Sequence, residues 1–320
     1  MKLQVKTFYG APLLMAVFFA VMKLPAAATS FDLQAYKCPS PPEPIHTLQV
    51  EGHYLPGTDA INVDGEKINT ERLKSLRELM ELSSHLSDSP SPTNARCLEG
   101  VLLSWASRDG LAVAVTDQAQ FERQWSLAGI GLALLKFPES MYIFDPAISK
   151  WLDSLLRDLE YYHERKHIKN NHAAWAALGA GAISMKFGSK EHWSWAMRTY
   201  KMVVDQIQPD GTLPLEIGRG IRASNYHLFA ALPLFILQKI GYCSHETPYK
   251  ADNIRSLLYL IRELKADKQR LWQYSGNKQI EVDEKDPAYF IAGDTDSDSF
   301  YTRIGGSALA LRHAISRCFQ

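Results

Sequence analysis

Two short stretches of the sequence place side chains that could bind and act on an anion. In the first, Asn171 and His172 open a predicted helix directly after a basic turn that contains Lys169. An amide and an imidazole can both donate hydrogen bonds to a carboxylate. An Asn-rich start is also typical of an ordinary helix cap, so the chemistry of this pair depends on what lies near it.

The second stretch carries Arg219, Arg222 and Tyr226. If a helix begins near Arg219, these residues lie at i, i+3 and i+7, and two guanidinium groups share one face with a phenol. Such a face suits an anionic ligand, because arginine binds carboxylates through two parallel hydrogen bonds. The positive charges also predict a lowered pKa for Tyr226. A solvated helix surface would show the same pattern.

A different chemistry is suggested by His163-Glu164-Arg165-Lys166-His167, which has the HExxH spacing of zinc metalloproteases. The Arg-Lys pair in its middle is strongly cationic beside a proposed dication and is typical of a solvated helix end. Zinc proteolysis is therefore a rival hypothesis. Loss of activity on chelation, with recovery on addition of zinc, would support it.

The elements that must position these residues are mainly helices. Apolar residues at helical spacing run from about Asn69 to Leu86, and Pro90 follows them. Residues 29–62 are rich in Pro and Gly without periodicity and predict an irregular lead-in. Strand signals are limited to about 111–115 and 279–282. Further helical stretches are predicted at about 94–107, 118–136, 145–165, 172–187, 190–207, 218–240, 249–266 and 303–317.

This order of elements predicts an all-α fold. Helices joined by short connections must pack their apolar faces against neighbours, as a bundle, a solenoid or a closed toroid. The composition does not choose among the three. The sequence has no internal repeat, which counts against a consensus-repeat solenoid.

The first 28 residues predict a cleaved secretory signal. Lys2 and Lys6 precede an apolar run of roughly fifteen residues, and small residues up to Ala28 follow it. That run is shorter than the ~20 apolar residues of a spanning helix, and no later stretch is long enough, so we expect no stable membrane insertion. We predict a signal peptide at 1–28, a single domain at 29–320, and a periplasmic or secreted mature protein.

Charge and cysteine content limit the partners. Lys plus Arg and Asp plus Glu each total 35, so loss of three lysines with residues 1–28 would leave a net charge of −3. No basic stripe stands out, and we expect no nucleic-acid partner. An even number of cysteines in an exported protein favours disulfides. The sequence does not fix the pairing, but the order along the chain makes Cys38–Cys97 with Cys243–Cys318 our first expectation.

Three segments in this order carry a family resemblance: NNHAAW at 170–175, DGTLPLE at 210–216 and RGIRASNYH at 219–227. They are similar to polysaccharide lyase family 5, which contains the alginate or poly(β-D-mannuronate) lyases. Order, spacing and residue identity agree across 170–227, and a weaker likeness extends upstream to the Pro-rich stretch after Cys38. The part of the chain after about Tyr242 matches poorly.

The resemblance implies an α/α toroid with a deep cleft and a lid loop, acting as a monomer on an anionic polysaccharide without a cofactor. Such an enzyme removes the C5 proton of a uronate and expels the C4 oxygen. By this likeness Asn171, Arg219 and His172 neutralise the carboxylate, as donors do in an oxyanion hole. Tyr226 takes the C5 proton and returns a proton to the leaving oxygen. A neutral His172 could instead act as the base in anti elimination from guluronate.

Residues that would contact further sugars are weaker candidates. They are His53 and Tyr54 on the lid, with Trp125, Trp175 and Arg222. Family members commonly carry Lys where this sequence has His53, and a titrating group there would make preference among polyanions depend on pH. Polyglucuronate and hyaluronan are therefore possible additional substrates. A non-catalytic polyanion-binding protein is the remaining alternative, although every expected catalytic position is filled.

Overall fold

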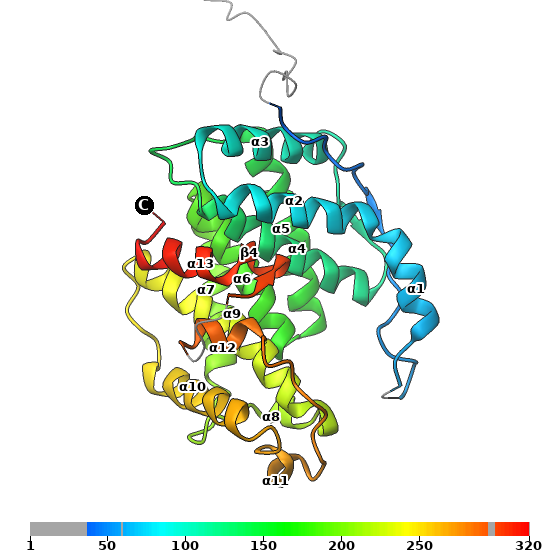
Figure 1. The fold of residues 1–320 in the computed structure, drawn as a ribbon, viewed down its shortest axis with the longest axis vertical. Helices are drawn as coiled ribbons and strands as arrows, with labels where there is room; N and C mark the ends of the chain where they lie inside the picture. The colour runs from blue at the N-terminus through cyan, green and yellow to red at the C-terminus, as the bar shows by residue number, and fades with distance from the viewer. Residues whose placement is uncertain (1–36, 59, 294–297, 320) are drawn as a thin grey trace, which may run out of the picture. The chain divides into compact units, whose positions relative to one another are not determined.

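The computed structural model describes residues 37–58, 60–293 and 298–319. The predicted signal peptide at 1–28 lies outside the described residues. Those that are described belong to one compact unit, Leu33–Gln320, in which helices dominate (Figure 1). The mostly helical prediction is confirmed.

The helices, in chain order, are α1 (Val63–Arg72), α2 (Lys74–Asp88), α3 (Pro92–Ala106), α4 (Asp117–Leu135), α5 (Pro146–Lys166), α6 (Asn171–Phe187), α7 (Lys190–Val204), α8 (Pro214–Ile217), α9 (Ala223–Cys243), α10 (Ala251–Ala266), α11 (Trp272–Ser275), α12 (Pro287–Ile291) and α13 (Ala308–Ser316). Single 3₁₀ turns occur at Gly220–Arg222 and Thr302–Ile304. The turn at Gly220–Arg222 means that α9 begins four residues after Arg219, later than expected.

Local sequence accounts for most helix starts. The Thr116 hydroxyl accepts a hydrogen bond from the backbone N–H of Ala119 at the start of α4, and Asp145 does the same for Ala147 ahead of α5. The Asn170 side chain caps α6 by accepting from the N–H of His172. The cap therefore fixes the backbone of the same turn that carries Asn171 and His172.

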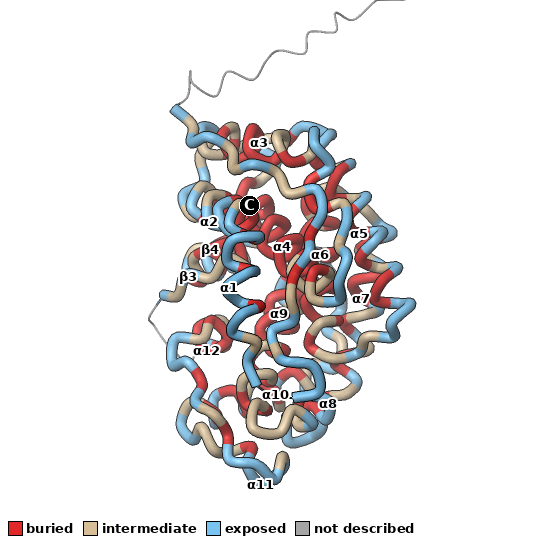
Figure 2. Tube along the Cα trace, turned by 90° about the vertical axis from the view of Figure 1, so that its right-hand side faces the viewer, coloured by how far each residue is buried: buried red, intermediate tan, exposed pale blue. Residues whose placement is uncertain are grey.

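Helices α4 and α6 form the centre of the unit. Helix α4 packs along α6, which also contacts α7 and α9, and the buried residues concentrate on these helices (Figure 2). Small residues permit the close approach: a Cβ on Gly131 would lie 3.0 Å from Cβ of Ala182, and one on Gly179 would lie 3.1 Å from the backbone nitrogen of Ala128. The two helices that carry Trp125 and His172 are thus held rigidly against each other.

Among the described residues, the strands are short. Strand β1 (Thr47–Leu48) pairs in parallel with β2 (Val113–Ala114), and β3 (Phe300–Tyr301) pairs antiparallel with β4 (Gly306–Ser307). The predicted strand at 111–115 is confirmed in its central residues, whereas the one at 279–282 is wrong. There, Ile280 donates its backbone N–H to Ile221, and the segment serves as a brace for the 3₁₀ turn before α9.

The segment between β3 and β4 is fitted closely against α4. A Cβ on Gly129 would collide with the Thr302 carbonyl oxygen, and a Cβ on Gly305, at φ +74°, would lie 2.8 Å from the Ala133 nitrogen. The buried Lys136 ammonium donates to the Asp88 carboxylate and to the Gly305 carbonyl, both at 2.6 Å. These contacts fix the position of Arg303, because Thr302 and Gly305, on either side of it in the chain, both pack against α4.

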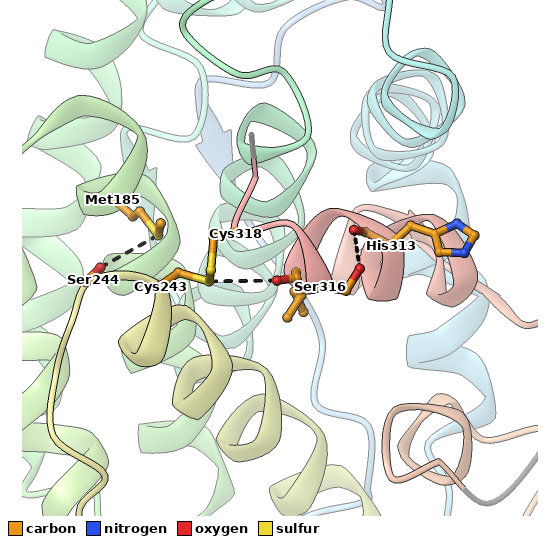
Figure 3. Close-up of a disulfide and its surroundings, with 7 residues drawn as sticks. Met185, Cys243, Ser244, His313, Ser316 and Cys318 are labelled. Atoms are coloured by element: carbon orange, nitrogen blue, oxygen red, sulfur yellow. Dashed lines mark hydrogen bonds between the residues drawn. A yellow bond between two sulfur atoms is a disulfide. The ribbon is translucent and has the colours of Figure 1, made fainter.

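Both expected disulfides are confirmed. Cys38 joins Cys97 on α3, and Cys243 at the end of α9 joins Cys318 beyond α13 (Figure 3). The second bond ties the C-terminal segment to the helix that carries Tyr226. No helix in the described part of the chain combines the length and apolar character that crossing a bilayer requires.

Candidate active site

A cavity of about 920 Å³ opens beside the N-terminal ends of α6 and α9. Its walls come from the loop 52–58, from α4, from the starts of α6 and α9, from the segment before α12 and from the 3₁₀ turn after β3. The lining side chains that carry charge or hydrogen-bonding groups are His53, Tyr54, Thr58, Gln118, Glu122, Trp125, His172, Arg219, Arg222, Asn225, Tyr226, Asp283, Asp286 and Arg303.

Seven of the nine predicted site residues therefore meet at one cavity. The two exceptions are Asn171 and Trp175, which are fully buried and do not line it. The Trp175 indole N–H donates to the carbonyl of Phe229 at 2.9 Å, and its ring packs in the core. Contact between Trp175 and a sugar, which the sequence suggested, does not fit this position, because core packing covers the ring.

Asn171 is joined to Arg219 through Glu216, a buried carboxylate. One Glu216 oxygen accepts from the backbone N–H of Asn171 at 2.8 Å, and the other accepts from its Nδ2 at 3.0 Å. Arg219 Nε lies 3.8 Å from the same second oxygen. Burial raises the pKa of Glu216, and these hydrogen bonds and the arginine oppose the rise. Glu216 thus orients two of the three predicted carboxylate-binding groups, Asn171 and Arg219.

His172 is a neutral imidazole. Its Nδ1 lies 3.0 Å from Nε2 of Gln124, and its ring stacks on Phe121 at a centroid distance of 3.7 Å. Burial lowers its pKa to about 3, with further lowering by Arg219, His163 and Arg303. At neutral pH this side chain can give or take a hydrogen bond but carries no charge.

Tyr226 lies against Arg219, whose guanidinium carbon is 4.6 Å from the centre of the phenol ring. We predicted a lowered pKa for this phenol, and that prediction is wrong. Burial raises the pKa, and a hydrogen bond with the Tyr54 hydroxyl raises it further. Arg219 and Arg222 act in the predicted direction, but their effect is smaller than the cost of placing a phenolate in a partly desolvated wall.

The loop 52–58 covers the cavity and contacts α9 through Tyr54. The guanidinium of Arg222 lies 4.6 Å from the Tyr54 ring centre, and the backbone of Tyr54 bridges to Ile61. His53 packs edge-on against the Tyr54 ring and pairs with Glu66 at 2.7 Å. The predicted lid residues are thus held over Tyr226 by one arginine and one glutamate.

Several lining residues were not predicted. Arg303 lies over the Trp125 ring at 3.8 Å and donates to the Tyr301 hydroxyl at 3.0 Å. Burial raises the pKa of Asp286 to about 6. Two wall atoms, Trp125 Nε1 and Asn225 Oδ1, are buried without a hydrogen-bond partner among the described residues. Phe121 could have been predicted from the sequence, because it lies one helical turn before Trp125. Arg303 could not, because it lies in a part of the chain that carries no motif.

The HExxH spacing does not produce a zinc-binding pair. His163 is buried and its Nε2 lies 2.8 Å from Oε1 of Gln124, while His167 is exposed at φ +51°, one residue beyond the end of α5. His167 therefore lies outside the helix that carries His163, and the regular i, i+4 geometry of a zinc-binding helix is not present. Within the described residues, no group of three potential metal ligands is close enough to hold an ion.

Comparison with known proteins shows a similarity to alginate lyases. Residues 145–278 match the family model described as "Alginate lyase". A polysaccharide lyase of Stenotrophomonas maltophilia (strain K279a) is 27% identical over 262 residues, which cover 76% of this chain and 77% of that protein. An alginate lyase of Pseudomonas syringae pv. syringae is 27% identical over 214 residues, covering 62% of this chain. The match spans 56% of the Pseudomonas protein's own length.

Solved structures share the fold. A complex of an alginate lyase A1-III variant with a tetrasaccharide superimposes with a TM-score of 0.75 at 20% identity and covers 86% of both chains. Alginate lyase A1-III from Sphingomonas species A1 gives a TM-score of 0.69, covering 87% of this chain and 89% of that one. The predicted α/α toroid is confirmed by these likenesses.

Proposed function

We propose that this chain is a polysaccharide lyase of the alginate lyase type, which cleaves uronate-containing polysaccharides by β-elimination. The observation that carries the proposal is the common wall formed by His172, Arg219 and Tyr226. It places a neutral imidazole and a guanidinium beside a phenol, under a lid that holds a second phenol. The family match of residues 145–278 supports the same reaction.

In the proposed mechanism, the substrate carboxylate binds between Arg219 and His172. The positive charge and the hydrogen bonds stabilise the negative charge that develops on the carboxylate when C5 loses its proton. The Glu216 carboxylate accepts a hydrogen bond from the Asn171 amide and pairs with the Arg219 guanidinium. It therefore holds these two groups close to each other. A different group must therefore remove the C5 proton.

Tyr226 is the proposed acid and base. As a phenolate it takes the C5 proton, the C4–O bond breaks as the C4–C5 double bond forms, and the phenol returns its proton to the leaving oxygen. No group other than the protein and the substrate is needed for this balance. Trp125 Nε1 and Asn225 Oδ1, which have no hydrogen-bond partner among the residues described, are suited to sugar hydroxyl groups.

Substrate class and location are part of the proposal. The lid residue His53 is held by Glu66, and Arg222 and Arg303 offer further carboxylate contacts in the cavity. We propose alginate and poly-β-D-mannuronate as substrates, with polyglucuronate and hyaluronan as additional ones. The two disulfides favour an oxidising compartment, so we propose a periplasmic or secreted protein. We also propose that it acts as a monomer.

Incubation with defined polymers tests the activity. Purified mature protein, without added metal, is mixed with polymannuronate, polyguluronate, mixed alginate, polyglucuronate or hyaluronan, and the ultraviolet absorbance of the new conjugated double bond is followed. We expect absorbance to rise with polymannuronate and to stay flat with a neutral polysaccharide. A flat trace on every uronate polymer would contradict the proposal.

A further inference from the structure

Gln124 connects the cavity to a second histidine behind it. Its side chain is fully buried in the middle of α4. The Nε2 atom lies 3.0 Å from Nδ1 of His172, and Oε1 lies 2.8 Å from Nε2 of His163. The mechanism proposed above does not use this residue, although among the described residues it is the hydrogen-bond partner of the His172 ring.

An amide has a fixed polarity, because its nitrogen only donates and its oxygen only accepts. In the orientation described, Gln124 donates to Nδ1 of His172 and accepts from Nε2 of His163. Nδ1 of His163 is then an unprotonated nitrogen, and it is buried without a hydrogen-bond partner in the part of the chain that the structure describes. Turning the amide over would force a proton onto that buried atom. A buried N–H donor without an acceptor is disfavoured, so the described orientation is the stable one.

This orientation decides what His172 can do. With Nδ1 accepting from Gln124, the proton of the neutral ring is on Nε2, the nitrogen on the edge away from Gln124. The groups that act on this ring from the packed elements are Arg219, Arg303 and His163, all of which oppose a second proton. His172 therefore offers an N–H to the cavity and has no free lone pair there.

We propose that Gln124 is a positioning residue that fixes His172 as a hydrogen-bond donor to the substrate carboxylate and thereby restricts the enzyme to syn elimination. This inference rests on the proposed lyase function. Because Nε2 already carries a proton, His172 cannot accept the C5 proton, and Tyr226 must do so. Mannuronate and glucuronate share the configuration in which the C5 proton and the C4 oxygen lie on one side of the ring. Guluronate, inverted at C5, is excluded.

Replacement of the amide by a carboxylate reverses the polarity. In Gln124→Glu, both side-chain oxygens accept, so the neutral His172 ring must move its proton to Nδ1 and lose the donor in the cavity. We expect about a 100-fold loss of kcat on polymannuronate, the size of effect seen when one oxyanion donor is removed, with a smaller change in KM. Gln120→Glu adds the same charge one turn earlier on α4, where the side chain contacts Arg123 and Ala114. This control should keep wild-type kcat.

The tautomer can be measured without activity. Nitrogen-15 NMR of histidine-labelled wild-type protein should show His172 protonated at Nε2 and not at Nδ1, with the reverse in Gln124→Glu. Wild-type protein with Nδ1 protonated would overturn the proposal, whether or not the variant folds. So would a Gln124→Glu protein with the reversed tautomer and unchanged kcat, or wild-type turnover of polyguluronate equal to that of polymannuronate.

The two proposals fail in different ways. If the wild-type protein shows the Nε2 tautomer but no polymer gives a double bond, the lyase function is wrong, and the restriction to syn elimination falls with it. If polymers are cleaved but the tautomer is Nδ1–H, the lyase function stands and the role of Gln124 is wrong.

Discussion

At the scale of single residues, the site of the unliganded protein keeps its proton-carrying groups neutral. Burial lowers the pKa of His172 to about 3 and raises that of Tyr226, so neither carries charge near pH 7. The positive charge that meets a uronate carboxylate therefore comes from arginine. Only one of these groups, the phenol of Tyr226, then changes its protonation during the reaction.

Tyr226→Phe tests that assignment. The change removes one oxygen and keeps the ring against Arg219, so polymer binding should be nearly unchanged. Loss of both the base and the acid should lower kcat by about 10³-fold or more. Steady-state kinetics on polymannuronate, with binding measured by calorimetry, would show the split. Tyr161→Phe on the exposed face of α5 is the matched control. Full turnover by Tyr226→Phe would rule out the phenol as the base.

Tyr54 gives a prediction for pH. Burial is the main cause of the raised Tyr226 pKa, and the Tyr54 hydroxyl adds to it. A base with a raised pKa is mostly protonated at neutral pH, so kcat/KM should rise as the pH increases. In Tyr54→Phe the added rise is removed, and the ascending limb of the kcat/KM profile should move to lower pH. An unmoved limb would show that the two hydroxyl groups are not coupled in the working enzyme.

At the scale of elements, the ends of helices bring the site together. The Asn170 cap fixes the first turn of α6, and Glu216 in α8 ties this turn to Arg219. The 3₁₀ turn that follows is braced by Gln279, whose Oε1 accepts from the N–H of Ser224 at 2.9 Å. Tyr226 lies in the first turn of α9, immediately after this brace. Each catalytic candidate thus lies within a turn of a capped or braced end.

A second contact between elements should make stability depend on pH. His192 on α7 is buried and lies 2.7 Å from Glu160 and 2.9 Å from Asp153, both on α5. The Glu160 hydrogen bond, with that of Asp153, raises the pKa of His192 despite burial. A raised folded-state pKa stabilises the fold below the unfolded value of about 6.5. That stabilisation is lost as the pH rises through the folded pKa.

His192→Gln is the test of this sign. The variant keeps hydrogen-bonding capacity but cannot become charged, so it should be less stable than the wild type by about 2 kcal/mol near pH 6. The difference should shrink as the pH rises to 9. Melting temperatures at both pH values would measure it, with His245→Gln, an exposed residue between α9 and α10, as the control. A difference that is constant with pH would show that His192 is not charged in the fold.

At the scale of the whole molecule, the sequence was informative where the site is local. The segments 170–175 and 219–227 each supply neighbouring site residues at the starts of α6 and α9, so motif and helical spacing sufficed to predict them. Arg303 was not predictable, because its position depends on the fit of Gly129 against Thr302, which no local pattern encodes. The predicted direction of the Tyr226 pKa shift was wrong for the same reason. The two arginines that lower this pKa can be seen in the sequence, but the burial that outweighs them cannot.

The disulfide between Cys243 and Cys318 links distant parts of the chain, since 75 residues separate its two halves. It joins the end of α9 to Cys318, which lies beyond α13, the helix that follows the Arg303 turn. Closing a loop of this length restricts the unfolded chain and stabilises the fold by about 2–4 kcal/mol. The paired change Cys243→Ser with Cys318→Ser should therefore lower the free energy of unfolding by that amount, measured by urea denaturation.

The same pair of changes separates stability from catalysis. The close fit of Gly129 and Gly305 and the bond between Lys136 and Asp88 hold the Arg303 turn on α4 without help from the disulfide. We therefore expect the double variant to keep near wild-type kcat at temperatures where it remains folded. Reducing agent should destabilise the wild type and leave this variant less affected, because only Cys38–Cys97 remains to be reduced. A variant that stays folded but loses turnover would show that the disulfide positions the cavity wall, and the packing of the turn against α4 would then be insufficient.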